Sequence, residues 1–188
     1  TVSSDPQRGH IEKFEDYVND FNIFLKETEN KNLPKPYYLL ANSMGAAIAM
    51  FAETARFEKI VLHAPMFKVN TYVIPTFIAN AILKTIRFFG FGSSYAPGSG
   101  PFLPKDFEEN TYARSKERYD FDIKSLKDNP QFIVSGPTVS WVDEALKVPE
   151  LLDRKIPQIN VPVLIIQAGH DFFVDNEQHK KYCSILKS

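Results

Sequence analysis

One run of the sequence, YYLLANSMGAAIAMFAE over residues 37–53, joins an apolar stretch to an alanine-rich stretch with almost nothing between them. The first five residues predict a strand buried on both faces, and those from Ser43 onward predict a helix. Because no loop separates the two, the residue at the junction must form a tight, strained turn above the carboxyl edge of a sheet. The small residues Ala41 and Gly45 permit the close approach of the two backbones that such a turn requires.

The same pattern recurs further along the chain. KIVLHAP (59–65) and VPVLIIQAG (161–169) predict two more buried strands, and residues 175–187 predict a helix after the last of them. Apolar residues at three- and four-residue steps between Ile11 and Phe24 predict an amphipathic helix before the first strand. This alternation predicts an α/β fold with a mostly parallel sheet that is covered by helices on both faces.

The middle of the chain has a different character. An apolar helical stretch (Tyr72–Phe89) is followed by a loop rich in Gly, Ser and Pro and by shorter helical pieces, with no further buried strand. We therefore expect a helical insertion in the position of a cap or lid. The predicted organisation has three parts: the first part of the core in 1–65, the cap in 66–160 and the second part of the core in 161–188.

Composition excludes several classes of function. Lys+Arg 22 against Asp+Glu 23 gives a net charge of -1, which provides no general basic field for nucleic acid. The single cysteine, Cys183, excludes an internal disulfide framework, fits a reducing compartment and is expected to pack within a helix face. Thr1–His10 lacks the apolar segment of a signal peptide, and no apolar run is long enough to cross a bilayer. We expect a cytoplasmic protein.

Two interpretations of Ser43 remain open from the pattern alone. As a nucleophile, its hydroxyl would be exposed at the turn, and the Met44 backbone N–H at the helix N-terminus would point toward a developing oxyanion. As a structural residue, it would simply be the N-cap of the alanine-rich helix. No His/Asp/Glu cluster has metal-ligand spacing and no Gly-rich phosphate loop is present, so neither metal nor cofactor is expected.

A catalytic serine in this architecture needs an acid after a later strand and then a histidine. Asp171 lies just past the third predicted strand and is the candidate acid, whereas Asp175 is expected to cap the following helix. None of the four histidines is predicted to be the base. His63 ends a strand beside the serine strand, where it either lines the pocket or is a satisfied strand-end residue, and His179 is expected in solvent.

Several segments together resemble a known family. The segments are DPQRGHIEKFEDYVNDF, ANSMGAAIA, IVLHAPMF, SSYAPGSGPF, GPTVSWVDEAL and VPVLIIQAGHDFFVDNEQHKKYC. They resemble the lysophospholipase L2 branch of the alpha/beta-hydrolases, a neighbour of the monoacylglycerol lipases. The resemblance implies that Ser43 is the nucleophile, that Asp171 orients the histidine and that the Met44 N–H is an oxyanion donor. It also implies a cap over the site and a lysophospholipid or monoacylglycerol substrate, with no cofactor.

The chain departs from the family's pattern in two ways. Asn42 stands where histidine is usual, and Ala41 and Ala46 stand where glycine is usual. The family's histidine lies roughly thirty residues beyond the acid, and a His-Gly-type loop precedes the first matching segment. Neither is found between Thr1 and Ser188, so the resemblance predicts a hydrolase fragment without its triad histidine. The alternative is a non-catalytic scaffold that binds lipid or a partner.

The apolar stretch Tyr72–Phe89 also has two interpretations. It is either a lid that lines an acyl channel or touches a membrane surface, or a cap helix packed on its neighbours. The first interpretation predicts peripheral membrane contact through the cap. The sequence offers no indication of oligomeric state.

Overall fold

The computed structural model describes residues 7–71 and 74–187, and the chain divides into two compact units. The sheet unit comprises Lys13–Thr76 and the residues from Glu144 onward, and the helical unit comprises the residues up to Glu12 and Phe77–Asp143. Each unit therefore brings together segments that lie far apart in the sequence.

The sheet unit contains three parallel strands in the order β1-β2-β3. They are β1 (Tyr38–Asn42), β2 (Lys59–His63) and β3 (Val163–Ile166). The register pairs Asn42 with His63 and His63 with Ile166, so all three strands end at one edge of the sheet. The predicted strands and their parallel arrangement are confirmed.

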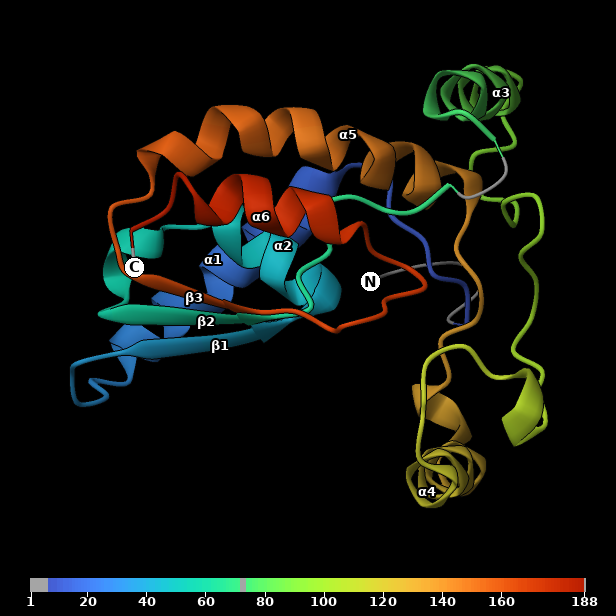
Figure 1. Cartoon of the computed structure of the whole chain (residues 1–188), viewed down its shortest axis with the longest axis horizontal. Coiled ribbons are helices and arrows are strands. Elements are labelled where there is room, and N and C mark those ends of the chain that lie inside the picture. Colours follow the sequence, from blue (N-terminus) through green and yellow to red (C-terminus); the bar gives the residue numbers. More distant parts are fainter. Residues whose placement is uncertain (1–6, 72–73, 188) are drawn as a thin grey trace. The chain divides into compact units, whose positions relative to one another are not determined.

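Helices cover one face of this sheet. They are α1 (Phe14–Asn30), α2 (Ser43–Phe51), the later turns of α5 (Val139–Lys155) and α6 (Asn176–Cys183), with the short turns η1 (Thr54–Arg56) and η4 (Ile156–Gln158) between them. Figure 1 shows α5 and α6 side by side above the strands. The Tyr182 hydroxyl of α6 donates to the Pro149 carbonyl oxygen and to Asp153 Oδ1 of α5 at 3.0 and 2.8 Å. Burial of the Tyr182 ring raises the pKa of its hydroxyl, and the Asp153 carboxylate raises it further.

The two faces of the sheet differ strongly in exposure. On the covered face Ile60, Leu62 and Val163 are almost fully buried, whereas on the other face Leu40 is 75% and Leu164 58% exposed. The prediction that the first strand is buried on both faces is therefore wrong for this chain. Alternation along a strand sends neighbouring side chains to opposite faces, and no described helix of the sheet unit covers the second face.

The helical unit is built from α3 (Thr76–Phe88), α4 (Lys116–Asp128), the first turns of α5 and two short turns, η2 (Phe107–Glu109) and η3 (Pro130–Phe132). Gly9 pairs with Pro137 in a parallel bridge, which joins the start of the chain to the segment before α5. Within α3 Leu83 is buried, while Phe77 is 73% and Phe88 85% exposed. No helix in the described part of the chain has the length and apolar character needed to cross a membrane.

Three further expectations need comment. The predicted apolar helix begins at Thr76 rather than Tyr72, and Tyr72 and Val73 lie outside the described residues. Cys183 is exposed at the end of α6, so the expected packed cysteine is wrong. His179 is 1% exposed, so its expected position in solvent is also wrong. The 3.6-residue period places both residues on a helix but does not show which side that helix presents to the sheet.

Candidate active site

The junction between β1 and α2 has the strained geometry that the sequence predicts. Ser43 follows the last residue of β1 and has a φ of 48°, in the left-handed region that costs an L-residue roughly 1–2 kcal/mol. Asn42 is the N-cap of α2, and its side chain makes no cap hydrogen bond. The interpretation of Ser43 as the N-cap is therefore wrong, because Ser43 is itself the first residue of the helix. Such strain in a non-glycine residue is typical of functional sites.

Backbone hydrogen bonds hold this turn in place. The Met66 N–H donates to the Ser43 carbonyl oxygen at 3.0 Å. The strand beside it ends in a similar way, since Ala64 follows β2 with a φ of 42° and its N–H donates to the Ile166 carbonyl oxygen at 2.7 Å. Two neighbouring strands are thus each followed by a left-handed residue, and the chain after β2 is bonded to the turn after β1 and to the end of β3.

Packing below the turn comes from alanine rather than glycine. Ala46 and Ala49 are 0% and 1% exposed on the inner side of α2. A Cβ atom added to Gly45 would meet no atom within 4 Å. The close approach of helix and sheet thus relies on the small side chains of the alanines. The expectation that Gly45 permits this approach is wrong, because the described structure leaves room for a side chain there.

Met44 lies in the first turn of α2 and is half-buried. The first N–H groups of a helix have no acceptor within the helix, and the helix dipole places partial positive charge around them. The Met44 N–H therefore has the chemistry that an oxyanion donor requires. The structure places it at the helix end that the sequence predicts.

Asp171 lies in the turn that follows β3 and is half-buried. Its Oδ1 accepts hydrogen bonds from the backbone N–H groups of Phe173 and Val174 at 2.8 and 3.0 Å, which fixes the carboxyl group in an Asx turn. Since β1 and β3 end at the same edge of the sheet, Asp171 and Ser43 are brought to that edge by the parallel register.

The competing acid, Asp175, has a structural role. It is the N-cap of α6 and accepts from the Glu177 N–H at 2.9 Å, as expected. Its Oδ2 also lies 2.8 Å from Lys68 Nζ, and this contact lowers the pKa of the Asp175 carboxyl below its ordinary value. A carboxylate that serves a cap and an ion pair is a poorer choice for orienting a catalytic histidine than Asp171.

The four histidines lie in distinct environments. His179 is buried, and its Nε2 donates to the Pro65 carbonyl oxygen at 2.7 Å. His170 is exposed in the turn beside Asp171, and His10 belongs to the helical unit. His63 is exposed at the end of β2, and its Nδ1 lies 2.7 Å from Asn42 Oδ1. Sequence reasoning missed this pair, because the contact depends on which strand residues face each other.

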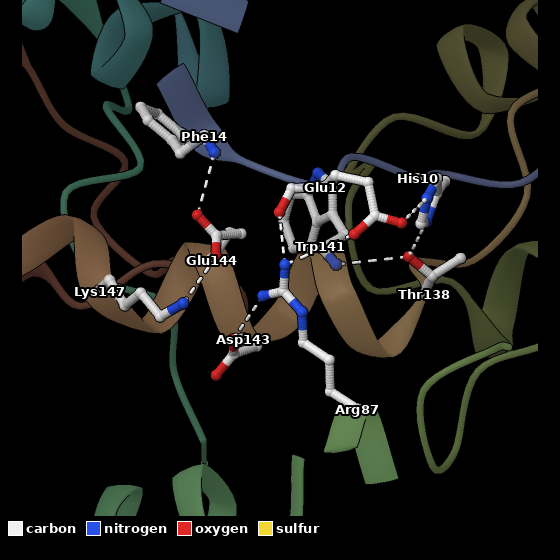
Figure 2. Close-up of polar contacts among 9 residues, drawn as sticks. All are labelled: His10, Glu12, Phe14, Arg87, Thr138, Trp141, Asp143, Glu144 and Lys147. Atoms are coloured by element: carbon white, nitrogen blue, oxygen red, sulfur yellow. Dashed lines mark hydrogen bonds and ion pairs between the residues drawn. The ribbon is translucent and has the colours of Figure 1, made fainter. Parts of the chain in front are cut away.

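Figure 2 shows the polar contacts that surround the first turns of α5. In the helical unit, Arg87 donates to Asp143 Oδ2 at 2.8 Å and to the Glu12 carbonyl oxygen at 2.6 Å. In the sheet unit, Glu144 accepts from the Phe14 N–H at the start of α1 at 3.0 Å. A carboxylate at a helix N-terminus satisfies a donor and complements the dipole. These contacts explain why charged groups are buried here, and the groups need no catalytic role to account for their burial.

Other features of the described structure do not form a competing site. A cavity of about 600 Å³ in the helical unit is lined by α4 and residues 104–108 and includes neither Ser43 nor Asp171. Among residues 7–71 and 74–187, no group of three or more His, Cys, Asp or Glu side chains is placed to hold a metal ion. The strained serine at the sheet edge is therefore the feature that most favours catalysis.

The chain is similar to several known proteins. The family model described as "Serine aminopeptidase, S33" (Hydrolase_4) matches residues 3–188. Lysophospholipase L2 from Escherichia coli (strain K12) is 32% identical over 186 residues, which cover 97% of this chain and 54% of that protein. Human monoglyceride lipase is 24% identical over 187 residues, or 91% of this chain and 55% of that protein. The chain thus spans about half the length of the curated relatives it matches.

Solved structures show the same fold. The monoacylglycerol lipase of Paleococcus ferrophilus has a TM-score of 0.66 and 18% identity, over 96% of this chain and 63% of that one. A soluble variant of the Saccharomyces cerevisiae monoglyceride lipase has a TM-score of 0.68 and 15% identity, over 100% and 62%. The predicted α/β-hydrolase architecture and the resemblance to the lysophospholipase L2 and monoacylglycerol lipase branch are confirmed.

Proposed function

The chain belongs to the alpha/beta-hydrolase family whose model is described as serine aminopeptidase, S33, and we propose that it acts as a serine hydrolase on the carboxylic esters of monoacyl lipids. The observation that carries this proposal is the left-handed φ of 48° at Ser43, directly between β1 and α2. Strain of this kind persists only where the surroundings enforce it. The names of the relatives, lysophospholipase L2 and monoglyceride lipase, support the choice of substrate class.

In the proposed reaction the Ser43 oxygen attacks the acyl carbonyl carbon while a histidine takes its proton. The carbonyl oxygen becomes an oxyanion, which the Met44 N–H stabilises. Collapse of this intermediate releases the leaving alcohol, which receives the proton from the histidine, and water then hydrolyses the acyl-enzyme in a second round. Asp171 orients the histidine and stabilises its charged form. None of the four histidines of this sequence is assigned the role of base.

The test is labelling with a fluorophosphonate probe, which reacts with activated serines. The protein is isolated from its natural source, and its intact mass and labelled peptide are measured. We expect the label on Ser43, and we expect a Ser43→Ala variant to remain unlabelled. Ser184→Ala, which changes an exposed serine at the end of α6, is the matched control and should keep the label. A folded protein that stays unlabelled would favour the non-catalytic lipid-binding scaffold instead.

The proposal takes as the cap that part of the expected range 66–160 which belongs to the helical unit, Phe77–Asp143, and gives α3 a role in membrane contact. Phe77 is 73% and Ile78 40% exposed on this helix, which carries basic residues near its end. Burial of one phenylalanine in a membrane interface contributes roughly 1.5–3 kcal/mol, so each truncation should weaken binding about tenfold or more. Co-sedimentation with lysolipid-containing vesicles measures this for Phe77→Ala and Ile78→Ala. Phe121→Ala on α4 removes an equally exposed ring and is the control.

Unchanged sedimentation of the α3 variants would contradict the membrane role. Weaker sedimentation of all three variants alike would show a non-specific effect of apolar surface and would contradict it as well.

A further inference from the structure

Two side chains at the ends of neighbouring strands form a pair beside the candidate nucleophile. Asn42 ends β1, His63 ends β2, and the parallel register places them opposite each other. His63 Nδ1 lies 2.7 Å from Asn42 Oδ1, and both residues are exposed. The pair therefore lies at the carboxyl edge of the sheet, and Ser43 is the very next residue after Asn42.

This hydrogen bond determines which ring nitrogen of His63 carries the proton. An amide oxygen can only accept a hydrogen bond, so Nδ1 must be the protonated nitrogen of the pair. In the neutral ring Nε2 then keeps its lone pair and is a hydrogen-bond acceptor. His179 shows the opposite arrangement, because its Nε2 donates to the Pro65 carbonyl oxygen at 2.7 Å.

The position of His63 relative to the nucleophile is fixed by the backbone. Ala64, with a φ of 42°, directly follows His63, and Met66 then donates to the Ser43 carbonyl oxygen at 3.0 Å. Only two residues, Ala64 and Pro65, therefore separate His63 from the residue that bonds directly to the serine turn. His63 is thus tied through a short, hydrogen-bonded segment to the turn that carries Ser43.

We propose that His63 positions the substrate by accepting, at Nε2, a hydrogen bond from a free hydroxyl group of the glycerol part of a monoacyl lipid, with Asn42 holding the ring in the required tautomer. The inference rests on the proposed function of Ser43 and deepens it. Both lysophospholipids and monoacylglycerols have a free hydroxyl near the ester, whereas a diacyl phospholipid has esterified that oxygen. His63 would thus help the site to choose monoacyl over diacyl lipids.

The chemistry of an unprotonated acceptor explains this choice. A site built to hydrogen-bond a substrate hydroxyl rejects an analogue that lacks it, since the acceptor would lose its water without gaining a partner. One such bond contributes roughly 0.5–1.5 kcal/mol, which corresponds to a preference of about two- to tenfold. The expected selectivity from this single contact is therefore moderate.

Nitrogen-15 NMR of the histidine rings at pH 8 tests the first half of the inference. His63 should be in the Nδ1–H tautomer, and His179 in the same spectrum should be in the Nε2–H tautomer. Asn42→Ala should shift His63 toward the Nε2–H form that free imidazole prefers, whereas Asn42→Asp keeps an acceptor and should preserve the Nδ1–H form. An Nε2–H tautomer of His63 in the unmodified protein would overturn the proposal.

A non-hydrolysable ligand tests the second half. We expect 1-O-hexylglycerol, an ether with free hydroxyls, to shift the Nε2 signal of His63 and to leave His179 unchanged. The same ether with both hydroxyls methylated should bind about two- to tenfold more weakly and leave the Nε2 signal in place. Equal responses to the two ethers, or no response to either, would overturn the proposal.

The outcome can be separated from that of the proposed function. Fluorophosphonate labelling of Ser43 without a hydroxyl-dependent signal at His63 removes this inference alone. A hydroxyl-dependent signal without labelling removes the hydrolase and supports a binding site for monoacyl lipids.

Discussion

The strain at the serine turn can be measured by replacing Ser43 with glycine. At a φ of 48° a non-glycine residue is strained by roughly 1–2 kcal/mol, and glycine removes that cost. The greater freedom of glycine in the unfolded chain offsets about 0.4–1 kcal/mol of the gain. Ser43→Gly should therefore raise the free energy of unfolding by about 1 kcal/mol relative to Ser43→Ala, which keeps the strain but also lacks the hydroxyl.

Matched variants show whether the effect belongs to the turn. Ala47 is fully buried inside the same helix, and Ala47→Gly should lower the free energy of unfolding by about 1 kcal/mol or more. Ala64→Gly, at a φ of 42° after β2, should act like the Ser43 variant. The expected sign thus reverses within four residues of one helix.

Urea titration followed by circular dichroism gives the free energy of unfolding for all four variants. A difference of 1 kcal/mol also corresponds to about 2–4 °C in Tm for a chain of this size. If Ser43→Gly proved as destabilising as Ala47→Gly, the turn would not be strained. The main structural support for Ser43 as a nucleophile would then be lost.

Three further predictions concern the sheet unit. Asp175→Ala removes the cap of α6 and the ion pair with Lys68 and should cost about 1 kcal/mol in a urea titration. Because the pKa of Asp175 is lowered in the folded protein, its contribution to the free energy of unfolding is complete above the unfolded pKa of about 3.9 and is lost as pH falls. Lys68→Met should therefore flatten the acid side of a plot of the free energy of unfolding against pH. An unchanged plot would refute the pairing of Lys68 with Asp175. Tyr182→Phe removes the hydroxyl proton that Pro149 and Asp153 share and should lower the free energy of unfolding in a urea titration by about 1–3 kcal/mol, whereas no change would mean that this hydrogen bonding contributes nothing. Gly45→Ala has open space for its methyl group and should raise Tm slightly through helix propensity worth up to about 1 kcal/mol, so a fall in Tm would contradict the observed packing of α2.

Periodicity in the sequence predicts the elements of this fold because it records which side of an element is buried. The strands, their parallel arrangement and the strained turn at Ser43 all follow from apolar runs and from the absence of a loop between residues 41 and 43. Sequence alone does not show which helix covers which face, and the exposed face with Leu40 and the buried position of His179 were therefore missed. The register between strands is likewise absent from any single segment, which hid the pairing of Asn42 with His63.

The short segment after β2 gives the site its rigidity, because it is bonded to every element that carries a candidate residue. Met66 donates to the Ser43 carbonyl oxygen at 3.0 Å, and Ala64 donates to the end of β3 at 2.7 Å. The Pro65 carbonyl oxygen accepts from His179 of α6 at 2.7 Å, and Lys68 pairs with the N-cap of that helix at 2.8 Å. The serine turn and the two elements that flank the acid-bearing turn, β3 and α6, are therefore tied to one stretch of five residues. A displacement of the Ser43 backbone would break its bond with Met66, so neighbouring chain outside α2 helps to maintain the strained φ of Ser43.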